Sequence, residues 1–301
     1  MTATRRSIIV PPLAAAGLAA FSESGVRTRL DRLLSWRLPG LRRAIRPGRI
    51  AILRLYGPIG GAGRTAEWID LARRLRESRR VPAVVLDIDS PGGSAGASDD
   101  LFLALERLAA KKPLVAAIRG TGASGAYLAA LAAQRIVANP TAIVGSIGVI
   151  NVAPRLPRLL ERIGVGVSEH TAGRLKGMGA PWRDESAPEA EKEQAIVDAI
   201  YASFVGRVSE ARKLSRQRVV ELATGEVWLG HAAVELGLVD EIGDLERAVE
   251  IAAQLAAVPA RAAPVRIRRP LLGRMIDRFA ARVARSLVEE IETLLGDRFR
   301  T

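Results

Sequence analysis

The stretch GTGASGAYLAALAA, residues 120–133, runs from small residues into an apolar helical pattern with Ser124 at the junction. If a strand turns into a helix here, the Ser124 hydroxyl projects from the turn. Gly125 then leaves a bare backbone N–H beside it that could receive an oxyanion, and the helix N-terminus favours negative charge. Serine is also a preferred helix N-cap residue. The spacing alone therefore leaves two functions open for Ser124, nucleophile or cap.

A nucleophilic serine needs a base, and this chain offers few. It has no cysteine and only two histidines, His170 and His231, neither of which has a recognisable acid–histidine arrangement around it. A desolvated lysine can act as a base, whereas arginine holds its proton too tightly. Of the five lysines, Lys176 stands in a Gly-rich loop, TAGRLKGMGAPWR, and the others fall in exposed or charged helical stretches. Lys176 is therefore the candidate base.

A second Gly-rich turn, DSPGGSAG at residues 89–96, follows an apolar run. Paired glycines let the backbone turn sharply and present N–H groups to a bound oxygen. The sequence contains no G-x-x-x-x-G-K-[ST] loop and no G-x-G-x-x-G after a strand, which makes nucleotide binding a poor explanation. The absence of cysteine and the scarcity of histidine also disfavour a metal site, so we expect no cofactor.

The elements that must position these residues alternate along the centre of the chain. Apolar and β-branched runs predict strands, and helical spacing of apolar residues predicts helices between them. The predicted strands are 49–59, 81–89, 113–118, 135–138 and 142–150, and the predicted helices are 65–78, 97–110 and 188–222. This alternation predicts parallel βα units, and hence an α/β fold rather than an all-α or sandwich fold.

The basic charge lies in the two ends of the chain. The net charge of +13 divides into +7 over residues 1–48, +5 over 258–301 and +1 over 49–257. In both ends arginine is interleaved with large apolar residues, which favours a membrane surface or a partner helix over nucleic acid. Residues 7–21 are apolar, but the segment is short for a bilayer span and is broken by two prolines.

These features predict three regions. Residues 1–48 form a basic extension with a possible membrane-associated helix, 49–257 form the central domain, and 258–301 form a basic amphipathic C-terminal helix. The apolar stripe over 271–296 fits core packing, a contact between copies or a membrane contact equally well.

Five stretches in the same order resemble signal peptide peptidases of the SppA type. They are LDIDSPGG, GTGASGAYLAA, NPTAIVGSIGVI, AGRLKGMGAPWR and GEVWLGHAAVELGLVDEIGDLERAV, and together they cover roughly residues 50–250. These proteins are serine–lysine proteases related in fold to the Clp protease and crotonase superfamily. The resemblance implies an α/β core of repeated β-β-α units with helical extensions at both ends of the chain.

The resemblance also implies roles for single residues. Ser124 matches the nucleophile, Lys176 the general base and Ser146 a serine that orients the lysine, while Gly93 and Gly125 match the oxyanion donors. It further implies hydrophobic peptide substrates such as signal-peptide remnants, no metal or nucleotide, and a ring-like homo-oligomer attached to a membrane. Lys176 could serve Ser124 of its own chain or of a neighbour.

Two departures and two alternatives qualify this expectation. The N-terminal apolar stretch is short and proline-broken where many relatives carry a clear anchor, so peripheral membrane attachment is the expectation. Gly177 follows Lys176 where an acidic residue is common. The alternatives are a crotonase-type acyl-CoA enzyme, which has no need of the Ser124–Lys176 pair, and a membrane-scaffolding homologue that does not cleave.

Overall fold

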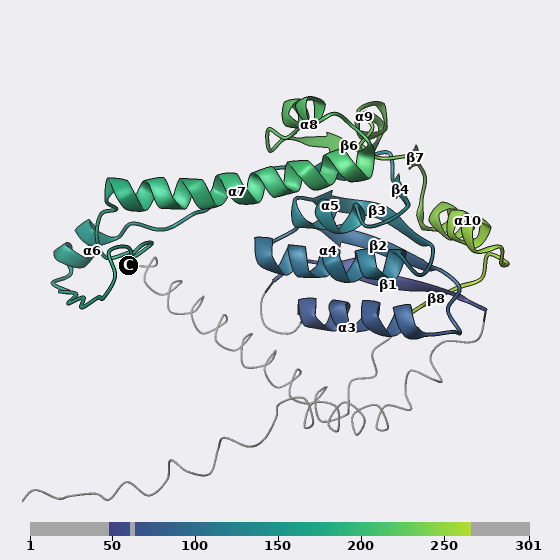
Figure 1. Cartoon of the computed structure of the whole chain (residues 1–301), viewed down its shortest axis with the longest axis horizontal. Helices are drawn as coiled ribbons and strands as arrows, with labels where there is room; N and C mark the ends of the chain where they lie inside the picture. The colour runs from purple at the N-terminus through teal and green to yellow at the C-terminus, as the bar shows by residue number, and fades with distance from the viewer. Residues whose placement is uncertain (1–47, 61–63, 266–301) are drawn as a thin grey trace, which may run out of the picture. The chain divides into compact units, whose positions relative to one another are not determined.

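The centre of the fold is an eight-stranded sheet within residues 48–60 and 64–265, the part of the chain that the computed structural model describes (Figure 1). Its main order is β6-β5-β3-β2-β1-β8, and β4 pairs with both β3 and β7. All pairs are parallel except β5 with β6. The predicted α/β class is confirmed. The strands are β1 Ile50–Tyr56, β2 Val84–Ser90, β3 Leu114–Ala123, β4 Arg135–Ala138, β5 Ile143–Gly145, β6 Val227–Leu229, β7 Glu241–Ile242 and β8 Ala262–Pro264.

The central strands β1, β2 and β3 are apolar on both faces because helices cover the sheet on both sides. On one face, α3 (Arg64–Glu77), α4 (Ala95–Ala109) and α5 (Gly125–Ala130) pack into the larger core with part of α7 (Ala187–Arg212). On the other face, α10 (Leu245–Ala256) packs against β1, β2 and β3 (Figure 1). The remaining helices are α6 (Pro157–Arg162), α8 (Arg216–Leu222) and α9 (Gly230–Glu235).

The strand β3 changes partner along its length. Its first half, Val115–Ile118, pairs with β4, and its second half, Thr121–Ala123, pairs with β5. The carboxyl end of β3 therefore lies between β2 and β5. This is the edge from which the Gly-rich turns leave the sheet.

Two predicted elements are wrong in their extent. The helix predicted over 188–222 is two helices, because Lys213 takes a left-handed conformation (φ 55°) after α7 and Ser215 caps α8 by accepting the Arg218 N–H at 3.1 Å. The strand predicted over 142–150 ends at Gly145, since Ser146 also has a positive φ of 49° and the chain leaves the sheet there.

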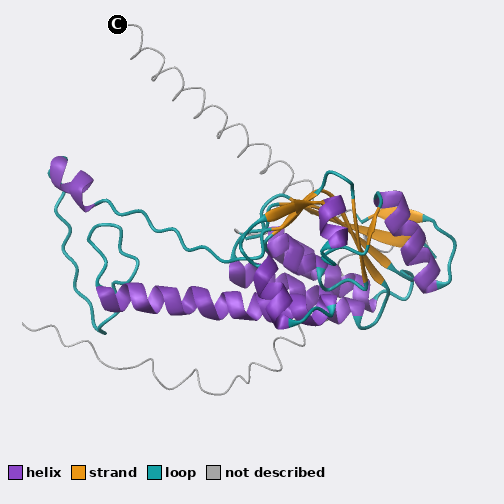
Figure 2. Ribbon diagram, turned by 90° about the horizontal axis from the view of Figure 1, so that it is seen from above, coloured by secondary structure: helices purple, strands orange, loops and turns teal. Residues whose placement is uncertain are grey.

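The first half of α7 and the chain before it form an arm, which we define as residues 150–196. Figure 2 shows α7 extending away from the sheet, with α6 also lying away from the sheet and separated from α7 by loops. Nine of the fourteen exposed large apolar residues in the described part of the chain lie on this arm. Such clustering is typical of an interaction surface.

The structure describes little of the two basic ends. Residues 1–47 and 266–301, which include the stretches 7–21 and 271–296 considered above, lie outside the described residues. The described residues 48–60 and 64–265 belong to one packed unit that holds the sheet, and β8 is part of it although it follows the predicted end of the domain at residue 257. Within 48–60 and 64–265, no helix is both long and apolar enough to cross a bilayer.

A buried hydroxyl ties α5 to the turn that follows α9. Tyr127 is fully buried and donates a hydrogen bond of 2.8 Å to the Leu238 carbonyl. We expect Tyr127→Phe to lower the free energy of unfolding by about 1–2 kcal/mol, because the Leu238 carbonyl loses this donor in a dry site. Tyr201→Phe is the matched comparison: its half-buried hydroxyl bonds the Ala223 carbonyl at 3.0 Å, and water can replace it. Urea denaturation that gives equal losses for both variants would contradict the prediction.

Candidate active site

The candidate site is built where two glycine-rich turns touch. The turn 91–94 follows β2, and the turn 123–125 follows β3. A Cβ placed on Gly92 would lie 2.6 Å from the Gly125 nitrogen and 2.9 Å from the Ser124 Cβ, distances that real Cβ atoms do not tolerate. Gly92 also has a φ of +87°. Only glycine permits this approach, which sets the backbone of one turn directly against the nucleophile candidate on the other.

The backbone of Ser124 is strained. It has φ 52° and ψ −124°, a region that residues other than glycine rarely occupy, and it stands at the N-cap position of α5 without making a side-chain cap. Its own N–H donates to the Gly145 carbonyl at 2.8 Å. The cap alternative for Ser124 is therefore wrong. A strained serine on a sharp strand-to-helix turn is instead the arrangement that exposes a nucleophilic hydroxyl.

Ser146 is brought beside Ser124 by strand register. Ala123 pairs with Gly145 across β3 and β5, so the next residue on each strand, Ser124 and Ser146, leaves the same edge of the sheet. The Ser146 N–H donates to the Glu226 carbonyl at 2.7 Å, which fixes its positive-φ backbone. The structure thus brings the two serines together, although 22 positions separate them in the sequence.

The two oxyanion candidates meet in the same place. The Gly93 nitrogen lies 3.5 Å from where a Cβ on Gly125 would stand. Gly93 is held against Ile59 by a short bridge, and a Cβ on it would come within 1.8 Å of the Ile59 carbonyl oxygen. Because α5 has only six residues, its dipole adds little stabilisation of negative charge. An oxyanion at this place would therefore depend mainly on hydrogen bonds from the backbone N–H groups.

These residues line one cavity of about 1010 Å³. Ser124, Ser146, Gly93 and Gly125 all contribute to its wall. Another part of the wall comes from α4, α5 and α7 and includes the apolar side chains Leu128, Ile200 and Phe204. The charged residues that line it are Asp99 and Arg207, which pair with each other at 2.7 Å. The cavity is therefore largely uncharged and suited to an apolar chain.

Lys176 is not part of this cavity. It is exposed on the arm, in the segment between α6 and α7, and its N–H bonds the Gly173 carbonyl at 3.1 Å. None of the chain's five lysines and neither histidine lines the cavity; all seven residues lie in the described part of the chain. The single chain thus assembles four of the five predicted site residues and leaves the predicted base apart.

The contribution of α7 to the cavity could not be predicted from the sequence. The spacing of Ile196, Ile200, Phe204 and Val208 indicates an apolar helix face, but nothing in it separates core contacts from cavity lining. Ser98 was also missed. It is buried in the first turn of α4, and its Oγ would lie 2.0 Å from a Cβ on Gly125. Ser98 lies four residues after the residue that precedes α4, and nothing in the neighbouring sequence indicates that it packs against Gly125.

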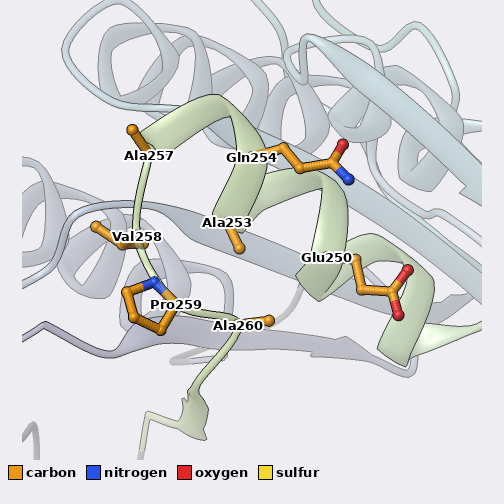
Figure 3. Close-up of a pocket in the computed structure, with 7 residues that line it drawn as sticks. All are labelled: Glu250, Ala253, Gln254, Ala257, Val258, Pro259 and Ala260. Carbon is orange, nitrogen blue, oxygen red and sulfur yellow. The ribbon is translucent and has the colours of Figure 1, made fainter.

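Other possible sites in the described residues hold none of the candidates. No group of three or more His, Cys, Asp or Glu side chains there is arranged to hold a metal ion. A pocket of about 520 Å³ lies between the end of α10 and the turn before β8, with Glu250 and Gln254 as its polar side chains (Figure 3). It shares no residue with the cavity around Ser124.

Comparison with known proteins gives a family. The model of peptidase family S49 matches residues 106–259, half of the chain. The chain belongs to peptidase family S49. Ser124, Ser146 and Lys176 lie inside the matched range, whereas Gly93 lies before it.

Several relatives are similar over most of the central domain. The chain is 38% identical to a Methanocaldococcus jannaschii protein that bears a provisional protease name, over 64% of this chain and 61% of that protein. It is 36% identical to the chloroplastic serine protease SPPA of Arabidopsis thaliana, over 69% of this chain and 32% of the relative. It is also 36% identical to a provisionally named protease of Synechocystis, over 70% of this chain and 75% of the relative. The chain thus spans less than two thirds of the first two relatives.

Among solved structures, a ClpP1 mutant from Listeria monocytogenes covers 65% of this chain and 93% of its own, with 16% identity and a TM-score of 0.46. The fold class of the S49 chain rests on its own sheet topology.

The contact behind Gly125 gives a test of the site's packing. We expect Gly125→Ala to lower the free energy of unfolding by about 1–3 kcal/mol, because its Cβ would overlap the Ser98 Oγ. In the double variant Ser98→Gly/Gly125→Ala the overlap is removed, so its loss should be at least about 1 kcal/mol smaller than the sum of the single losses.

The control is Gly96→Ala, which lies on α4 with Ser98, because a Cβ on Gly96 meets nothing within 4 Å. It should be neutral or stabilising by up to about 1 kcal/mol. Strictly additive losses for Ser98→Gly and Gly125→Ala, measured by urea denaturation, would show that the two residues do not crowd each other.

Proposed function

We propose that this S49 protein is a serine endopeptidase in which Ser124 is the nucleophile and Lys176 the general base. The observation that carries the proposal is Ser124 itself. Its backbone is strained, its side chain caps no helix, and it lies on the wall of a largely apolar cavity beside the backbone N–H groups of Gly93 and Gly125. Backbone strain of this kind persists where the surrounding structure enforces it, and here two packed turns and the Gly145 carbonyl do so.

Acylation of Ser124 is the first step of the proposed reaction. The neutral amine of Lys176 takes the proton of Ser124 Oγ while Oγ bonds to the carbonyl carbon of the scissile peptide. The carbonyl oxygen becomes an oxyanion and accepts hydrogen bonds from the Gly93 and Gly125 N–H groups. When the C–N bond breaks, the Lys176 ammonium gives its proton to the leaving amine, and the acyl group remains on Ser124 as an ester.

Deacylation repeats the same proton movements with water. Lys176 takes a proton from the water as the water oxygen bonds to the ester carbon, and it returns a proton to Ser124 Oγ as that bond breaks. The products are a carboxylic acid and the free serine. Ser146 accepts a hydrogen bond from the Lys176 amine and so aims it at Ser124. No metal or nucleotide takes part in this scheme.

The substrates we propose are hydrophobic peptides, such as the remnants of cleaved signal peptides. Leu128, Ile200 and Phe204 give the cavity an apolar wall, and its one charged pair neutralises itself. A peptide with apolar side chains gains binding free energy when those side chains move from water into such a cavity. The basic segments 1–48 and 258–301 would hold the protein at an anionic membrane surface, where such peptides arise.

We further propose that Lys176 reaches Ser124 of a second copy. Lys176 is exposed on the arm and lines no part of its own chain's cavity. The same arm carries exposed apolar side chains, among them Ile150, Val152 and Ile163, with relative exposures of 87%, 80% and 62%. Contact between copies through the arm would bury these side chains and also complete the site.

The first test is cleavage of a hydrophobic, signal-like peptide by the full chain. We expect Ser124→Ala to abolish cleavage and Lys176→Ala to slow it at least about 100-fold, because a positioned base contributes this much or more.

The matched control is Lys192→Ala, which removes another exposed lysine from the same arm and should leave the rate unchanged. Cleavage that survives Ser124→Ala would exclude the serine mechanism. No cleavage by any form, including the wild type, would favour the acyl-CoA or scaffolding alternative.

Mixed assemblies test the origin of the base. Chains carrying Ser124→Ala alone should be inactive and chains carrying Lys176→Ala alone should cleave at least about 100-fold more slowly than the wild type, yet fast cleavage should return when both are produced together. Some sites then combine an intact Ser124 from one copy with an intact Lys176 from another. Co-production of Ser124→Ala with the double variant Ser124→Ala/Lys176→Ala is the control and should stay inactive. If mixed oligomers form without activity, the base acts within its own chain.

A further inference from the structure

The turn that carries Lys176 is fastened to α7 by an ion-pair network. Arg183 binds Glu189 in a two-pronged arrangement, with Nη2 to Oε1 at 2.6 Å and Nη1 to Oε2 at 2.9 Å. The same Nη2 donates to the carbonyl of Gly177 at 2.9 Å. One guanidinium therefore connects the first turn of α7 to the residue that follows Lys176.

On the α7 side of this network, Glu189 is held by several hydrogen bonds. Glu189 is nearly buried, with its side chain 4% exposed, and it accepts hydrogen bonds from the Ser186 N–H at 2.9 Å and the Ser186 Oγ at 2.8 Å. These contacts cap the first turn of α7. The Arg183 guanidinium and the Ser186 donors hold the pKa of Glu189 well below its usual range. The carboxylate thus stays charged at neutral and alkaline pH.

A second carboxylate closes the network around Gly177. Glu169 lies 3.5 Å from the Arg183 Nε and accepts the Trp182 indole N–H at 2.8 Å. A Cβ on Gly177 would stand 2.1 Å from the Glu169 Oε1 and 2.7 Å from the Arg183 Nη2. The network therefore occupies the space that a side chain would need at this position, so the Glu169 and Arg183 side chains would have to move to admit any residue other than glycine.

We propose that Arg183, anchored by Glu189, is a positioning residue that sets the direction of Lys176, an inference that rests on the proposed role of Lys176 as base. A flexible lysine in an exposed, glycine-rich turn has many accessible directions, whereas fixing the Gly177 carbonyl restricts the backbone from which it projects. A base displaced by about 1 Å loses much of its catalytic effect. An arginine suits this task because its planar fork can serve Glu189 and a carbonyl at once.

The test measures how fast a small alkyl fluorophosphonate labels Ser124 in the full-length protein. This reaction reports activation of the serine without requiring a known peptide substrate. Arg183→Met and Arg183→Lys are compared with Arg247→Met, each made in the wild type and in Lys176→Ala. Arg247 is a matched control because it also bridges two glutamates, Glu241 at 2.6 Å and Glu250 at 3.2 Å. Its side chain is 41% exposed against 37% for Arg183, and it lies on α10.

We expect Arg183→Met to slow labelling at least about tenfold in the wild type and less than about twofold in Lys176→Ala, because it acts only through the lysine. Arg183→Lys should fall between the two, since it keeps the charge toward Glu189 but loses the fork. Arg247→Met should match the wild type. With a peptide substrate, the Arg183→Met loss should appear in kcat rather than in KM.

Each other outcome has a distinct meaning. If Lys176→Ala slows labelling and Arg183→Met does not, the positioning role is wrong and the proposed function stands. Equal slowing by Arg183→Met in both backgrounds would assign Arg183 a merely structural role. A change of oligomer size in Arg183→Met, measured by light scattering, would make Arg183 a contact residue between copies and overturn the positioning role. If Lys176→Ala itself labels at the wild-type rate, the proposed base is wrong and the inference fails with it.

Discussion

The close approach of the turns 91–94 and 123–125 is the constraint on which the candidate site depends. Gly92 stands where any side chain would collide with the backbone of Gly125 and with Ser124. The contact is possible because β2 and β3 are parallel neighbours, with Ser90 opposite Gly122 at their carboxyl ends. The strained backbone of Ser124 is enforced from one side by this contact and from the other by the bond to Gly145. The candidate site thus depends on the register of the strands and on Gly92 and Gly93, where only glycine fits.

The candidate site has two parts, one held by the sheet and one on the arm. Ser124, Ser146, Gly93 and Gly125 follow the ends of strands whose side chains pack into the larger core, so their relative positions are fixed by the core. Lys176 lies instead on an arm with exposed apolar side chains and few contacts to the sheet. Under the proposed function, this division would couple activity to assembly, because the base would meet the serine only when copies come together. The Arg183–Glu189 pair would then supply on the arm the order that the core supplies around Ser124.

The helix α7 links these two halves. Its first turn is capped by Ser186 and Glu189 on the arm, and its last turns line the cavity and pack into the larger core through Phe204 and Val208. At its end, Arg212 bonds the Gly237 carbonyl at 2.8 Å and pairs with Asp240 at 3.1 Å, which holds the helix against the turn after α9. Because α7 is one continuous helix of 26 residues and is held against the core at its carboxyl end, the core also determines where its first turn lies. The direction of the Lys176 turn is therefore set by the same core that shapes the cavity.

The sequence by itself determined the features that depend on near neighbours. Buried parallel strands appear as apolar runs, so the α/β class could be predicted from the run of residues alone. Ser124 and the Gly-rich turn at 89–96 stand out because strand-to-helix turns need small residues, and Lys176 stands out because lysine is scarce in this chain. Only the tertiary structure decided that Ser146 lies beside Ser124, that α7 walls the cavity and ends at Arg212, and that Lys176 stands apart from both serines. These features depend on strand register and on contacts between residues far apart in the chain, and local composition does not encode such contacts.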